Sequence, residues 1–160
     1  MSLPPKASLS EYVYRRLAPH EWDMKQVVYP VVFEIAEGMK GLSVYRADIA
    51  TPHMVLEARL DDARKLLESD DEATREKGAS ILKKNPDVSA LLSKGYRVIA
   101  IPIASIKAMG INDDTFSMDG TKGHMNILGS VALFDNLKFS FLELLKTEVA
   151  WVLNDKDCLS

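Results

Sequence analysis

The hydrophobic positions near the two ends of the chain follow the pattern of β-strands. Three segments are rich in β-forming side chains and stop at turn-forming residues: 12–17, 42–47 and 96–101. The third is a nearly continuous apolar run ended by Pro102, which predicts a strand buried on both faces. Residues 27–35 also have strand composition, but Pro30 suits the start of a helix, so both structures stay open there.

The middle of the chain has the spacing of amphipathic helices. Thr51 and Pro52 suit the cap and the first turn of a helix. The apolar positions that follow are spaced by four, three and four residues: Leu56, Leu60, Ala63 and Leu67. A second helix is expected to run to about Lys84, because Ser69 and Glu72 have the spacing of a capping box.

This second helix has few apolar positions and contains Gly78, which predicts that residues 70–84 form an exposed excursion. Shorter helices are predicted over residues 85–95 and 105–110. A long amphipathic helix is predicted over residues 136–154, where the apolar positions are Leu137, Phe141, Leu145, Val149 and Val152. Strands at both ends, with helices between them, favour an α+β fold whose small sheet is mostly antiparallel or mixed.

Composition and charge narrow the classes of protein. The chain has 160 residues, 47% hydrophobic and 27% charged, which predicts one globular domain over residues 1–160 with a frayed start at 1–10. Twenty basic and 23 acidic side chains give a net charge of −3, so nucleic acid is not expected as a partner from the net charge, which leaves a local basic patch open.

The single cysteine and the lack of a recognisable targeting signal predict a soluble cytoplasmic protein. The single Cys158 excludes an intramolecular disulfide and a multi-cysteine metal site, as expected in a reducing compartment. Residues 1–10 hold no apolar block, and no apolar run reaches the roughly 18–20 residues of a membrane span, so no membrane association is expected. The three histidines lack the spacing of zinc ligands, so no metal site is predicted, and the sequence leaves cofactors open.

The strongest candidate for a functional segment is a glycine-rich polar loop that leads into a short apolar strand. On that strand His124 and Asn126 are two residues apart and share a face. His124 would act as a general acid or base, and Asn126 would orient the substrate. The loop at residues 119–123 has the composition of a phosphate loop but lacks its spacing and its helix. Alternatively, His124 closes the loop by bonding to backbone, and Asn126 lies at a strand edge.

A second group of candidates places arginine beside tyrosine on two of the predicted strands. If these strands are neighbours, Arg15 and Arg46 would converge on an anionic ligand, with Ser43 and Tyr45 available for hydrogen bonding and stacking. Arg15 and Arg16 point to opposite faces, so one of them at most serves a given pocket. Alternatively, the arginines pair with surface carboxylates and the tyrosines are half-buried core.

The order of these residues resembles that of the site residues in ADP-ribosyltransferase-like domains. The resemblance covers Arg15 on an early strand, Ser43 and Tyr45 on the next strand, and a polar residue on a late strand. It departs from the family pattern on that late strand, where residues 124–130 contain no glutamate. The departure puts transfer chemistry in doubt.

Three functions are therefore compatible with the sequence. The first is a binding or accessory module that recognises a phosphate-bearing small molecule or a protein partner, with the charged helices at 57–84 as its outer surface. The second is an enzyme acting on a nucleotide, NAD or RNA, ADP-ribosyltransferase-like or nuclease-like, with His124 as acid or base. The third is a protein that self-associates through its C-terminal amphipathic helix.

Overall fold

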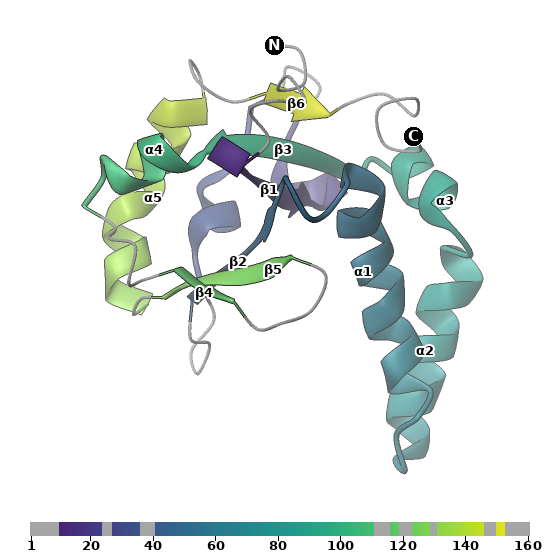
Figure 1. Ribbon diagram of the computed structural model, residues 1–160. Coiled ribbons are helices and arrows are strands. Elements are labelled where there is room, and N and C mark those ends of the chain that lie inside the picture. The colour runs from purple at the N-terminus through teal and green to yellow at the C-terminus, as the bar shows by residue number, and fades with distance from the viewer. Residues whose placement is uncertain are drawn as a thin grey trace.

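The strands of the chain form one antiparallel sheet (Figure 1). The computed structural model describes residues 10–23, 27–35, 41–110, 116–118, 123–128, 131–145 and 150–152. In these ranges the strands are β1 (Tyr12–Leu17), β2 (Gly41–Arg46), β3 (Arg97–Pro102), β4 (Phe116–Met118), β5 (His124–Leu128) and β6 (Ala150–Val152). Their order across the sheet is β4-β5-β2-β1-β3-β6, and each neighbouring pair is antiparallel.

Helices cover both faces of this sheet, as Figure 1 shows. Their bounds are α1 (Pro52–Leu66), α2 (Glu72–Lys84), α3 (Val88–Ser93), α4 (Ile103–Lys107) and α5 (Val131–Leu145), with short 3-10 turns η2 (Pro19–Glu21) and η3 (Pro30–Phe33). An antiparallel sheet with helices at its faces confirms the predicted α+β class. In the described part of the chain, no helix has the length and apolar character needed to cross a membrane.

One core lies between the sheet and α5, α4 and η3. Alternate residues of β1, β2, β3 and β5 face it, so Val13 and Leu17 of β1 meet Met125 and Ile127 of β5 in the same cluster. Its largest side chains, Phe33, Phe134 and Phe141, are fully buried. The rings of Phe33 and Phe141 stack with their centroids 4.5 Å apart, which ties η3 to α5.

A second core lies on the opposite face of the sheet, under α1 and α3. It contains Val55, Leu56 and Leu60 of α1 with Leu91 and Leu92 of α3, packed on the other set of alternate strand residues. Because these helices cover β1 and β3, the face of β2 and β5 on this side stays partly open.

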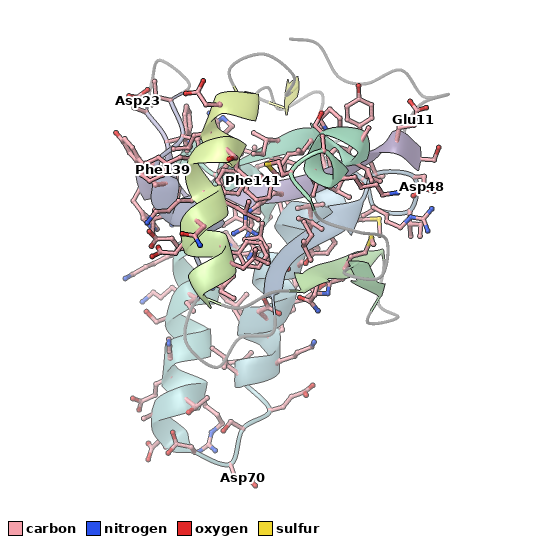
Figure 2. The ribbon with its side chains drawn as sticks, turned by 90° about the vertical axis from the view of Figure 1, so that its left-hand side faces the viewer. Glu11, Asp23, Asp48, Asp70, Phe139 and Phe141 are labelled. Atoms are coloured by element: carbon pink, nitrogen blue, oxygen red, sulfur yellow. The ribbon has the colours of Figure 1, made fainter. Side chains whose placement is uncertain are left out.

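The helices α1 and α2 form a hairpin that extends beyond the sheet, with Asp70 at its far end (Figure 2). The predicted excursion at 70–84 therefore packs on α1. Gly78 is the contact point, because an added Cβ would lie 2.7 Å from the Ala63 carbonyl oxygen. The cap of α2 is Asp71, whose carboxylate accepts from the Thr74 amide, and Ser69 instead accepts from the Asp71 amide. The prediction of Ser69 as the cap was wrong, because Asp71 stands three residues before that amide.

The predicted helix at 136–154 is also corrected. Helix α5 begins earlier, at Val131, and ends at Leu145, and residues 150–152 pair with β3 as a strand. Residues 146–149, 153 and 154 lie outside the described residues. The apolar spacing of residues 149–152 fits either a helix or a strand. The strand forms at 150–152 because the backbone groups at the edge of β3 pair with it. Phe141 is buried inside the fold, so it is not available for docking on another copy.

Residues 27–35, which the sequence left open, form neither a regular strand nor an α-helix. Val28 makes an isolated antiparallel bridge to Trp22, and Pro30 then starts the short 3-10 helix η3. The fixed φ of proline suits that first turn. Trp22 is anchored by its indole N–H, which donates to the carbonyl oxygen of Gly95 at 2.8 Å.

Candidate functional site

A cavity of about 560 Å³ lies where α1 passes over the open face of the sheet. We call it the α1 cleft. Its sheet side is formed by Arg16, Ser43, Tyr45 and His124. Its other wall, from α1 and the turn after it, is formed by Ala58, Asp61, Asp62, Arg64, Lys65 and Glu68. Strand alternation explains the sheet side, because Met125 and Ile127 face the α5 core and so turn His124 to the α1 side.

Ser43, Tyr45 and His124 are in direct contact inside the cleft. The ladder places Tyr45 opposite His124 and Ser43 opposite Asn126, which brings Ser43 diagonally next to the imidazole. The Ser43 Oγ and His124 Nε2 atoms are 2.5 Å apart, a short hydrogen bond. The ring of Tyr45 meets the imidazole edge-on, with centroids 5.0 Å apart. These contacts fix the orientation of His124.

Arg16 is the arginine of β1 that faces the cleft. Its register partner is Val98, which belongs to the core under α1. Its Nη1 donates to the carbonyl oxygen of Val55 at 3.3 Å, so the side chain bridges the sheet and α1. Arg16 also lines a neighbouring cavity of about 380 Å³, which we call the side cavity.

The side cavity continues from the α1 cleft, because both are lined by Arg16, Ser43 and Tyr45. Its remaining walls carry Arg15, Ala18, His20, Glu21, Arg59 and Tyr96. Three arginines therefore surround it together with a single carboxylate, that of Glu21. In the α1 cleft, by contrast, three acidic side chains balance the three basic ones other than His124.

Arg15 has a structural role on the other face of β1. Its Nη1 donates to the Ser43 carbonyl oxygen at 2.5 Å, and its Nη2 and Nε donate to the Val32 carbonyl oxygen at 2.5 and 3.1 Å. The bonds join β1 to η3 and to β2. Burial lowers the pKa of Arg15 to about 10, which leaves the guanidinium protonated at neutral pH. The backbone carbonyl oxygens of Ser43 and Val32 thus stabilise its positive charge.

Arg46 lies away from the cleft. Alternation along β2 puts it on the face opposite Ser43 and Tyr45. Its Nη2 and Nε donate to the two carboxylate oxygens of Asp48 at 2.6 and 3.0 Å. The pairing matches the alternative in which a strand arginine serves a surface ion pair. The structure therefore does not bring Arg46 together with His124.

The acidic wall on α1 is partly neutralised within the helix. Arg64 Nη1 donates to Glu57 at 2.8 Å and to Asp61 at 2.7 Å. Hydrogen bonds to these two carboxylates raise the pKa of the Arg64 guanidinium. Asp62 and Lys65 stand one turn apart on the cleft side of the same helix.

The segment before β5 is only partly described. Residues 119–122 of the glycine-rich loop lie outside the described residues. Gly123 has φ of +81°, a backbone conformation that favours glycine, and its carbonyl accepts from the Arg46 amide at 2.9 Å. Asn126 is half-buried and shares the face of His124.

Of the residues that line the α1 cleft, the sequence analysis named Ser43, Tyr45 and His124 as candidates and did not name Arg16 or the residues of the α1 wall. The sequence predicts that Arg15 and Arg16 point to opposite faces of the sheet. It does not predict which face carries the cleft, because that depends on where α1 crosses the sheet. Among the residues that the structure describes, no group of three or more histidine, cysteine or acidic side chains is arranged to hold a metal ion. Comparison of the chain with family models, curated proteins and solved structures found no match.

Proposed function

We propose that the protein binds a small phosphate-bearing ligand where the α1 cleft and the side cavity meet. The observation that carries this proposal is that Arg16, Ser43 and Tyr45 line both cavities. At this junction a guanidinium, a hydroxyl and a phenol surround the same space. Arginine suits phosphate because its planar fork can donate to two oxygens at once.

The charge distribution supports placing the phosphate toward the side cavity. The guanidinium of Arg15 is bonded to backbone carbonyls, but the other walls of the side cavity carry Arg16 and Arg59 against Glu21. In the α1 cleft the acidic and basic side chains balance. An anion is therefore favoured on the side of the junction that faces the side cavity over the α1 cleft, where the charges balance. Phosphate at the junction would lie beside Arg16 and within reach of His124.

The rest of the ligand has aromatic and hydrogen-bonding surfaces available. Tyr96 lines the side cavity and Tyr45 lines both cavities, so a planar ring could stack on either of them. Asp61 and Asp62 offer carboxylate oxygens to hydroxyl groups. The combined volume suits a ligand the size of a nucleoside phosphate.

A second candidate function is an enzyme acting on the same ligand, with His124 as acid or base and Asn126 beside it. The 2.5 Å separation between Ser43 Oγ and His124 Nε2 favours it, because a hydroxyl bonded to an imidazole can pass its proton to the ring. The binding proposal does not depend on this chemistry.

Isothermal titration calorimetry with adenosine 5′-monophosphate, phenyl phosphate and inorganic phosphate tests the binding proposal. The variant is Arg16→Gln, and the matched control is Arg46→Gln on the opposite face. Loss of a hydrogen bond to a charged group costs about 1.5–3 kcal/mol, which is about 10- to 150-fold in Kd. We expect this loss for Arg16→Gln and an unchanged Kd for Arg46→Gln.

Two results would contradict the proposal. One is the absence of heat from all three compounds with the wild-type protein. The other is equal weakening by both variants, which would place the anion outside the junction. Thermal melts without ligand report whether Arg16→Gln keeps its fold after losing the contact to Val55.

A further inference from the structure

We infer that Ser43 is a nucleophile that accepts a phosphoryl group from a phosphate monoester bound where the α1 cleft and the side cavity meet. The inference rests on the proposed function and adds the reaction. Ser43 Oγ is 2.5 Å from His124 Nε2, and both residues line the same cavity. A hydroxyl nucleophile within hydrogen-bond reach of a base, with the base itself oriented, is the arrangement that activates serine.

The imidazole is oriented by its neighbours on the sheet. Tyr45 meets the ring edge-on at 5.0 Å, and the β2–β5 ladder fixes the strand positions of Ser43 and His124. Arg15 bonds to the carbonyl oxygen of Ser43, which restrains the backbone from which the hydroxyl projects. Nucleophile and base are thus held on paired strands of the sheet, so little reorganisation is needed before reaction.

The reaction has two balanced steps. In the first, Ser43 Oγ bonds to phosphorus, the Oγ proton passes to His124 Nε2, and the bond between phosphorus and the leaving oxygen breaks. The leaving alkoxide takes the proton from the imidazolium and departs as an alcohol. In the second, water attacks the phosphoserine and gives a proton to His124, which returns it to Ser43 Oγ as that bond breaks. The products are an alcohol and inorganic phosphate.

Arg16 is the group placed to stabilise the charge on the transferring phosphoryl oxygens. It lines the cleft beside Ser43 and bridges the sheet to α1 through Val55. Phosphoryl transfer depends mainly on positioning and on such electrostatic stabilisation. Lys65 supplies a second positive charge from the opposite wall.

The test is covalent labelling of the full-length protein with an alkyl fluorophosphonate, followed by intact-mass measurement and peptide mapping. Attack by serine displaces fluoride, so the label marks the nucleophile directly. The variants are Ser43→Ala, His124→Gln and Ser80→Ala, the last an exposed serine on α2. We expect one label on Ser43, none in Ser43→Ala, unchanged labelling in Ser80→Ala and at least a roughly 100-fold slower rate in His124→Gln.

Hydrolysis of p-nitrophenyl phosphate by the same proteins supplies the catalytic readout, and it should follow the labelling. Absence of label on wild-type Ser43, with phosphate binding retained in calorimetry, would overturn the inference and leave the proposed function standing. Absence of both would overturn both. Labelling of Ser43 without any binding or hydrolysis of phosphate compounds would overturn the phosphoryl assignment. Because the wild-type label is mapped directly, a variant that fails to fold does not obscure the result.

Discussion

The packing of α2 on α1 predicts that Gly78→Ala lowers the stability of the protein, although alanine is the better helix former. Gly78 is buried at the crossing of the two helices. A Cβ at this position would lie 2.7 Å from the Ala63 carbonyl oxygen and 2.7 Å from the Leu66 Cβ. Ordinary contacts between carbon atoms are about 3.5–4.0 Å, so α2 would have to move by roughly 1 Å.

The magnitude follows from two opposing terms. Replacing glycine by alanine inside a helix is worth about 1 kcal/mol in favour of folding. Forcing an extra carbon into packed surroundings costs about 1–3 kcal/mol, and here one neighbour is a backbone oxygen that cannot rotate away. We therefore expect a net loss of about 1 kcal/mol, or about 2–4 °C in Tm for a chain of this size.

Urea denaturation followed by circular dichroism measures this change, with Ala79→Gly as the matched control in the same helix. Ala79 is exposed, so its replacement reports the propensity term alone, a loss of about 1 kcal/mol. A gain of stability for Gly78→Ala equal in size to the loss for Ala79→Gly would refute the close approach of the two helices.

Two further predictions concern Arg15 and the cap of α2. Arg15→Leu leaves the carbonyl oxygens of Val32 and Ser43 without their donor and should cost about 2–4 kcal/mol in urea denaturation, while Arg46→Leu should change little. Hydrogen bonds from Thr74 lower the pKa of Asp71 in the folded state, so their stabilisation is present above the unfolded value of about 3.9 and is lost as the pH falls through the folded pKa. Denaturation between pH 2 and 7 should therefore show a steeper acid loss for wild type than for Asp71→Asn.

Much of the fold was predictable because local patterns agreed with the tertiary structure. The strand predicted at 12–17 coincides with β1, where the alternating residues pack on two separate cores. The predicted start of α1 is confirmed by its cap, since Thr51 Oγ1 accepts from the Met54 amide at 3.2 Å. Both signals are carried by residues that are close together in sequence.

The predictions that were wrong concern features that depend on contacts between residues far apart in the sequence. Residues 150–152 pair with β3, and no local signal separated this short strand from the end of an apolar helix. For the same reason the sequence analysis chose Arg15, and not Arg16, as the ligand-binding arginine of β1. The cleft lies on the face of β1 that carries Arg16, because α1 crosses the sheet there. Arg15 lies on the other face and links β1 to η3 and to β2 through hydrogen bonds.

The candidate residues that the structure brings together are those linked by strand register. Ser43, Tyr45 and His124 share one face of the β2–β5 pair. Alternation along β2 accounts for the shared face of Ser43 and Tyr45, whereas the pairing of β2 with β5 had no signal in the sequence. The helix wall opposite them carries charged residues that the sequence assigned to an outer surface. Their place in the cleft arises from the angle at which the α1–α2 hairpin leaves the sheet (Figure 1).

The most direct test of the central claim is a two-dimensional ¹H–¹⁵N NMR titration with phenyl phosphate. If the ligand binds at the junction of the two cavities, the backbone amides of Arg16, Ser43, Tyr45 and His124 shift together and saturate with one Kd. The amides around Phe139, a residue 61% exposed on α5 at the other face of the sheet, should stay unchanged. Shifts that are absent from the four cleft residues, or that centre on α5, would contradict the account.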